Sequence, residues 1–413
     1  MRIVNVLLIA FFISVSSVYC QQSSNLTFKE GAFYQAKELY NNGQYGEAQM
    51  RFEEILLSNN DVHNQYSVES QFYSALCAIR LFNDDADKLI TSFVYKYPES
   101  KMVNRAYFEM AMFRYRQKNF ADANKWFSKV NKKSLYNSDK YDYYFKYGYS
   151  LFMENEYEKA KMMFVEIKDV DNEYSSPAKY YYAHIAYSEG NYQTALESFN
   201  KLEDDESFSP LVPYYKAHIF YLQKDYDKVI EYVAQSLEDY SVKRAAEMSR
   251  IVAEAYYQKK EYNNAVPFIE KFMKESKAVK RNDYFLSGYI YYRSDNLDKA
   301  IESFEKVVVE EDSLAQNSYY SLADCYLKQN DKSKALTAFH RAAALDFDKK
   351  IKEEAMFFAA KLSYELNYTP FNQSIEALEN YINLFPDPLL KNMLMVRETS
   401  SSNSFSATPG FWK

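Results

Sequence analysis

Hydrophobic and polar positions recur along this 413-residue chain with a nearly constant period. In each period a small residue is followed four positions later by a large apolar or aromatic residue, and successive small residues lie 34–37 positions apart from Ala123 to Ala335. These pairs are Ala48/Phe52, Ala123/Phe127, Ala160/Phe164, Ala195/Phe199, Val229/Val233, Ala265/Ile269, Ala300/Phe304 and Ala335/Phe339. A fixed period of this length predicts a stack of equivalent structural units.

Each unit is expected to be a pair of helices joined by a turn. A second small residue lies twelve positions before the first in every unit, at Ala36, Ala111, Gly148, Ala183, Ala217, Ala253, Gly288 and Ala323. A polar break separates the two small residues, as at residues 190–192. The apolar residues before the break follow helical spacing, for example Tyr319, Leu322 and Tyr326, and no hairpin turns separate alternating apolar runs. Small residues at these positions let the two helices approach closely.

These positions resemble the tetratricopeptide repeat, which has a 34-residue helix–turn–helix unit. The resemblance covers residues 30–386 and is looser at two units, one with Ser74, Ala86 and Ile90 and one with Ala360, Ile375 and Leu378. It implies an all-α fold, a right-handed superhelical solenoid of about ten repeats with one continuous core. The endings Tyr97-Pro98 and Phe385-Pro386 resemble those of bacterial envelope-assembly and cell-division coordinator proteins.

The two ends of the chain differ from the array. Residues 1–20 have the pattern of a secretory signal peptide, cleaved before Gln21, followed by a linker at 21–29. An uncleaved anchor and a lipidated Cys20 are the alternatives, although Tyr19 fits a lipoprotein signal poorly. Residues 387–396 are expected to form a partial helix or an incomplete next repeat, which leaves open that the chain is a shortened form of a longer protein. A Ser-rich tail at 397–413 is expected to be disordered.

Charge and cysteine content narrow the range of partners. The formal net charge is −7, which does not favour nucleic acid, because that binding depends on clustered Lys and Arg. The acidic clusters 204–206 and 310–312 are interpreted as solvated loops between units. Cys77 and Cys325 fall in first helices of distant units, too far apart for a disulfide, and are expected to be small core residues.

The sequence contains none of the common catalytic motifs, so neither enzymatic activity nor a cofactor is expected. His184, His218 and Glu254 occupy the same position in consecutive units. A zinc site would need three such ligands to converge, and neighbouring repeats are about 10 Å apart. These residues are therefore interpreted as polar residues lining a binding surface rather than as metal ligands.

The chain has 42 Tyr and 30 Phe, more than the core alone explains. In tetratricopeptide arrays the first helices line the concave surface, and repeat positions 5 and 12 face it. Position 5 holds Phe108, Phe145, Tyr180, Tyr214, Arg250, Phe285 and Tyr320. Position 12 holds Tyr115, Phe152, Tyr187, Tyr221, Tyr257, Tyr292 and Leu327, while His184, His218, Glu254 and Asp324 add polar groups. The rings predict either a binding groove or packing between neighbouring helices.

The resemblance and the aromatic rows together predict a non-catalytic scaffold that holds a protein or peptide partner in its concave groove. The expected location is the periplasm or the periplasmic face of the outer membrane, with a partner from the envelope machinery. Contact with the membrane is expected only by association or by lipidation at Cys20. The alternatives are a glycan-handling accessory protein of an outer-membrane uptake system and the recognition part of a longer envelope or secretion protein.

Overall fold

A computed structural model describes residues 30–58, 64–236, 244–366, 381 and 383–385 of the chain. Across these residues the fold is all-α and contains no strand, as the sequence predicts. The predictions for residues 1–29 and 387–413 lie outside the described residues, and so do Ile375 and Leu378.

The helices follow one another in pairs, each with a first helix, a short turn and a second helix. Their contacts form two compact units divided between Val212 and Pro213, and each unit is described by itself. The first unit contains helical residues 30–41, α2 (Tyr45–Leu57), α3 (Gln65–Leu81), α4 (Ala86–Lys96), α5 (Val103–Arg116), α6 (Phe120–Phe127), the 3-10 turn η1 (Lys132–Ser134), α7 (Asn137–Met153), α8 (Tyr157–Val165), α9 (Ser175–Ser188) and α10 (Tyr192–Asn200).

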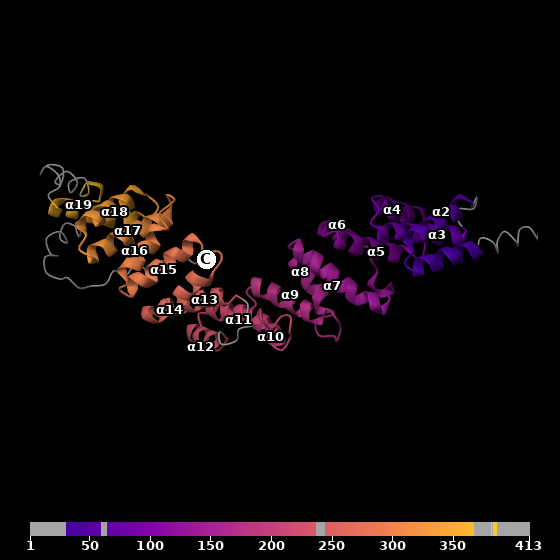
Figure 1. Cartoon of the computed structure of the whole chain (residues 1–413), viewed down its shortest axis with the longest axis horizontal. Coiled ribbons are helices and arrows are strands. Elements are labelled where there is room, and N and C mark those ends of the chain that lie inside the picture. The colour runs from indigo at the N-terminus through magenta and orange to yellow at the C-terminus, as the bar shows by residue number, and fades with distance from the viewer. Residues whose placement is uncertain (1–29, 59–63, 237–243, 367–380, 382, 386–413) are drawn as a thin grey trace, which may run out of the picture. The chain divides into compact units, whose positions relative to one another are not determined.

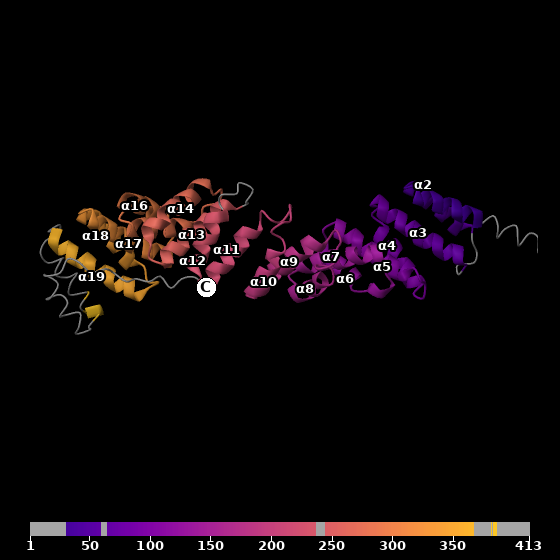
Figure 2. The same cartoon turned by 90° about the horizontal axis from the view of Figure 1, so that it is seen from below.

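The second unit contains α11 (Val212–Leu222), α12 (Tyr226–Ser236), α13 (Ala245–Gln258), α14 (Tyr262–Glu275), α15 (Arg281–Arg293), α16 (Leu297–Glu305), α17 (Ser313–Lys328), α18 (Lys332–Ala344) and α19 (Lys349–Leu366). Within each unit the pairs stack in chain order, which Figure 1 and Figure 2 show from two directions. The repeat with Ser74, Ala86 and Ile90, which resembles the family less closely, is the α3–α4 pair. Ala86 and Ile90 are both buried.

The small residues of the period form the contact between the two helices of each pair. Every small residue in the second helices, from Ala48 to Ala335, is completely buried, and the large residues four positions later are at most 2% exposed. Burying one such Phe side chain contributes about 1.5–3 kcal/mol, so the repeated pair of a small and a large residue adds stability in every helix pair. The period read from the sequence is therefore the core of the fold.

Each described turn within a pair is closed by one residue in the left-handed conformation. Gly43 and Gly190 fill this place in two turns, and the other turns use Phe82, Lys118, Asn155, Lys224, Lys260, Asp295 and Asn330. At Lys118 the backbone N–H bonds the Tyr115 carbonyl at 2.9 Å, and the N–H of Asn119 bonds the Arg114 carbonyl at 3.0 Å. This pair of bonds satisfies carbonyls at the end of the first helix and fixes the direction of the second.

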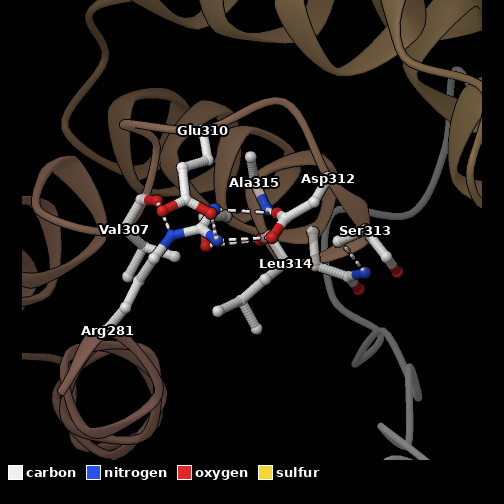
Figure 3. A network of polar contacts seen from close by, with 9 residues as sticks. Arg281, Val307, Glu310, Asp312, Ser313, Leu314 and Ala315 are labelled. Carbon is white, nitrogen blue, oxygen red and sulfur yellow. Dashed lines mark hydrogen bonds and ion pairs between the residues drawn. The ribbon is translucent and has the colours of Figure 1, made fainter.

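Polar side chains hold the loops between consecutive pairs. Figure 3 shows Arg281 at the start of α15 reaching the loop before α17, where its Nε donates to the Val307 carbonyl at 2.5 Å and its guanidinium pairs with Glu310 and Asp312. Asp312 also caps α17 by accepting from the Ala315 N–H at 2.8 Å. Hydrogen bonding to Arg281 lowers the pKa of Asp312. The acidic cluster at 310–312, interpreted from sequence as a solvated loop, is instead partly an ion-paired helix cap.

Two further findings concern the thiols and the membrane. Cys77 and Cys325 are free and completely buried, as expected for core residues. Burial raises the pKa of each thiol to about 12.

Among the helices that the structure describes, none combines the length and apolar character needed to cross a membrane.

Candidate functional site

The position-5 rings pack against the second helix of their own pair. Their partners are the core phenylalanines, with centroid distances of 6.5 Å for Phe108–Phe127, 6.1 Å for Phe145–Phe164, 6.4 Å for Tyr180–Phe199, 6.2 Å for Phe285–Phe304 and 5.6 Å for Tyr320–Phe339. Phe108 is only 2% exposed and belongs to the core, whereas the other members of this row are half-buried. The row thus contributes to packing and, except at Phe108, keeps part of each side chain accessible.

The position-12 rings contact the aromatic residue that follows the turn. Centroid distances are 5.9 Å for Tyr115–Phe120, 5.6 Å for Phe152–Tyr157, 5.8 Å for Tyr221–Tyr226 and 5.7 Å for Tyr257–Tyr262. All residues of this row, Leu327 included, are half-buried. These four rings are therefore fixed along one edge by the turn, which leaves pre-positioned aromatic surface on the first helices.

Several tyrosine hydroxyls of these rows bond to the next pair. In the second unit, Tyr320 donates to Glu354 at 2.7 Å and Tyr292 donates to Asp324. Burial raises the pKa of both tyrosines, and the carboxylates raise it further. These hydroxyls therefore tie consecutive first helices together, which is the packing role that the sequence left open.

A buried carboxylate lies at the centre of the surface formed by α11, α13 and α15. Glu254 is 7% exposed, bonds to Arg250 one turn earlier and accepts a hydrogen bond from Tyr221. The carboxylate of Asp283 lies 3.9 Å from the Arg250 guanidinium. Burial raises the pKa of Glu254 to about 7, although the charge of Arg250 opposes this shift. Glu254 is thus poised to change its charge near neutral pH.

An imidazole on α11 lies among aromatic rings, one of which, Tyr221, also bonds to Glu254. His218 is stacked between Tyr214 and Tyr221, at centroid distances of 6.1 and 6.4 Å. The guanidinium of Arg244 lies over the Tyr214 ring, 3.7 Å from its centroid. Burial, with the charges of Arg250 and Arg244, lowers the pKa of His218, which favours the neutral imidazole. We call this set the α11–α13 cluster: Tyr214, His218, Tyr221, Arg244, Arg250 and Glu254.

A second histidine occupies the same repeat position in the first unit. The His184 ring lies 5.6 Å from Phe152, 6.3 Å from Tyr180 and 6.2 Å from Tyr187 between ring centroids. Burial lowers the pKa of His184. The structure thus brings four predicted site residues of the first unit into one aromatic cluster.

The residues that the structure describes include no group of three or more His, Cys, Asp and Glu side chains placed to hold a metal. His184 belongs to the first unit and His218 to the second. Glu254 bonds to Arg250 and Tyr221, which already use its oxygens. Its neighbours therefore suit a buried ion pair better than a metal.

Sequence reasoning missed an ion-pair chain across three first helices of the first unit. Glu109 in α5, 3% exposed, pairs with Arg80 of α3 at 2.9 Å and with Arg105 at 2.6 Å, and Arg105 also pairs with Asp139 of α7. Arg105 and Asp139 are 34 residues apart, one repeat period. That spacing between opposite charges is the signal that the sequence offered. The sequence likewise gave no sign of Arg244 in the α11–α13 cluster, or of Asp283 beside it.

Comparisons with known proteins agree with the repeat architecture. The family model of anaphase-promoting complex (cyclosome) subunit 3 matches residues 258–342, which run from the end of α13 into α18. No curated protein sequence matches the chain. The observed helix pairs and this match agree with the tetratricopeptide-type repeat that the sequence predicts.

Several solved structures are similar to the chain. The C-terminal part of a TPR repeat-containing protein from Cytophaga hutchinsonii is 19% identical, with a TM-score of 0.49, and the match covers 60% of this chain and 98% of that one. A tetratricopeptide repeat protein from Parabacteroides merdae is 15% identical, with a TM-score of 0.35, covering 75% and 98%. Residues 41 to the end of MamA from Desulfovibrio magneticus are 19% identical, with a TM-score of 0.36, covering 41% and 94%.

Proposed function

We propose that this array of tetratricopeptide-type repeats is a non-catalytic scaffold that holds a protein or peptide partner against its first helices. The observation that carries the proposal is the row of half-buried aromatic side chains at repeat position 12. Four of these rings, at Tyr115, Phe152, Tyr221 and Tyr257, are fixed along one edge by the residue after the turn, so binding would cost little side-chain entropy there. Large, rigid aromatic side chains of this kind commonly dominate protein-binding surfaces.

The two units offer this partner different chemistry. In the first unit the predicted residues gather as rings around His184. In the second unit they gather around the Arg250–Glu254 ion pair. A partner segment bound to the first unit would therefore present apolar side chains, and one bound to the second unit would present hydrogen-bonding groups.

The location we propose is the cell envelope of a bacterium, in the periplasm or on the periplasmic face of the outer membrane. The support is the sequence pattern of residues 1–20. Mass spectrometry of the mature protein tests this point. A mature chain that begins at Gln21 agrees with export, and one that retains Met1 in a soluble cytoplasmic fraction contradicts it.

Partner capture by alanine variants tests the binding function. Tyr187 and Tyr257 suit this test because they are half-buried and lie one in each unit. We expect Tyr187→Ala with Tyr257→Ala to lower partner recovery at least about tenfold, which corresponds to 1.4 kcal/mol. The helical circular dichroism should stay unchanged. The matched control is Tyr95→Ala, because Tyr95 is 88% exposed on a second helix. Equal loss in the control, or undiminished recovery by the double variant, contradicts the proposal.

A further inference from the structure

Charge is distributed very unevenly in the first unit, although the whole chain carries only −7. Residues 101–140 contain ten Lys and Arg but three Asp and Glu, a net charge of +7. The loop between α6 and α7, residues 128–136, carries +3 with no acidic residue. The next two loops between pairs, residues 166–174 and 201–211, each carry −3. In the first unit one basic loop is therefore followed by two acidic loops.

The three loops lie side by side along one edge of the unit. Lys132 of the basic loop bonds to Glu166 of the first acidic loop at 3.2 Å. Lys201 of the second acidic loop bonds to Asp169 of the first at 2.9 Å. These two ion pairs connect the loops in order. The edge thus has a basic end and an acidic end, separated by about one repeat, or roughly 10 Å.

Part of this charge is not neutralised within the chain. Among the described residues, Lys133 of the basic loop and Asp171 of the first acidic loop form no ion pair, and both are exposed. Lys129 lies over the Trp126 ring, 4.5 Å from its centroid, and pairs with no carboxylate that the structure describes. Unpaired charges of opposite sign at neighbouring loops are available to a complementary surface.

Exposed apolar side chains accompany the charges on the same edge. Tyr136 in the basic loop is 74% exposed, and Val170 in the first acidic loop is 41% exposed. Tyr is enriched at the centres of protein interfaces. These two side chains therefore give the charged edge an apolar component that an interface could bury.

We propose that this edge of the first unit docks a second copy of the chain through a two-fold axis between the basic loop and the first acidic loop. Such an axis places the basic loop of each copy on the acidic loop of its partner, as an isologous interface requires. Tyr136 and Val170, one in each of these two loops, are exposed and supply the apolar contact. The surface differs from the first-helix rows and adds an assembly to the proposed function.

The occupant follows from charge complementarity. A membrane of anionic lipids would attract the basic loop but repel the two acidic loops, the nearer of which lies about one Debye length away. A purely acidic partner protein would meet the same repulsion. A second copy satisfies both ends at once.

Charge-reversal variants of the purified protein test the proposal, with dimer formation measured by sedimentation velocity. The basic-loop variant is Lys129→Glu with Lys133→Glu, and the acidic-loop variant is Asp171→Lys with Glu173→Lys. Neither variant changes the intramolecular pairs of Lys132 or Asp169. Wild-type protein should form a dimer that dissociates as salt increases, and each variant alone should dimerise at least about tenfold more weakly. An equimolar mixture of the two variants should restore the dimer, because each surface then meets its opposite.

The control is Lys88→Glu with Lys118→Glu, two exposed lysines outside these loops whose substitution changes the net charge by the same amount. It should dimerise like wild type. A monomeric wild-type protein at low salt, or a variant mixture that stays monomeric while both variants keep their helical circular dichroism, overturns the proposal. So does binding of monomeric wild type to phosphatidylglycerol vesicles that only the basic-loop variant loses, because the surface then recognises lipid.

Discussion

Gly288 in α15 lies so close to Phe304 in α16 that a Cβ added to the glycine would be 2.7 Å from Cε1 of the ring. The same relationship recurs four repeats earlier, where a Cβ on Gly148 would lie 2.9 Å from Cε1 of Phe164. Both rings are completely buried and cannot move without disturbing the core of their pair. In these two pairs, unlike those with alanine at this position, close contact between the first and second helix depends on the absence of a side chain.

We expect Gly288→Ala to destabilise the second unit by about 1–3 kcal/mol, because overpacking forces the Phe304 ring from its site. Gly46→Ala in α2 is the control, since nothing lies within 4 Å of a Cβ there and Ala favours a helix. Denaturant unfolding measures both. A Gly288→Ala protein as stable as wild type would show that the contact is not tight.

At Lys260, in contrast, a glycine should stabilise the protein. Lys260 has φ 63° and closes the turn between α13 and α14. A residue with a Cβ is strained in this region, whereas glycine is not. We expect Lys260→Gly to raise stability by about 0.5–1 kcal/mol. Thermal unfolding measures it, and Gly190→Lys, at an equivalent turn with φ 78°, should lower the melting temperature. A lower melting temperature for Lys260→Gly contradicts this account.

Stability should depend on pH through Glu254. Burial raises its pKa from 4.5 to about 7, so the folded state binds a proton more tightly than the unfolded state does. The stabilisation from this proton is complete below pH 4.5 and is lost as pH rises to about 7. The predicted loss is about 3 kcal/mol.

The Glu254→Gln variant isolates this contribution from other titrating groups. Its free energy of unfolding should match that of wild type near pH 4.5, and the variant should become the more stable protein above pH 7. Urea unfolding across this range measures the difference. A difference that does not change with pH would mean that Glu254 is charged throughout.

Gln316 is predicted to hold the connection between α18 and α19. The side chain is completely buried, its Nε2 donates to the Leu345 carbonyl at 2.7 Å, and its Oε1 accepts from the Asp348 N–H at 2.7 Å. Gln316→Leu leaves these backbone groups buried without partners and should cost about 2–4 kcal/mol. Gln329→Leu, which removes an exposed bond to Asp298, should change stability by less than about 0.5 kcal/mol. Equal effects of the two substitutions in urea unfolding would contradict the assignment.

The sequence predicted the core far better than the polar contacts. Residues such as Ala300 and Phe304 recur with a constant spacing because the two helices approach each other in the same way in every pair. The repeated helix pair could therefore be predicted from the spacing of these residues. The bond from Tyr320 to Glu354 depends on how neighbouring pairs are stacked, which no local pattern encodes. Sequence likewise could not separate Phe108, which is buried, from the half-buried rings at the same position. The net charge of the whole chain gives no sign of the basic loop at 128–136, because acidic residues elsewhere outweigh its lysines.

Site-specific photocrosslinking tests the proposed binding surface most directly. A photoreactive phenylalanine analogue would replace Tyr187, Tyr257 or, as the control, Tyr95 in cells that produce the protein. The aromatic positions on the first helices should each crosslink the same partner, whereas Tyr95 on α4, 88% exposed, should not. Crosslinking of that partner from Tyr95 with equal yield, or its absence from both first-helix positions in folded protein, would contradict the account.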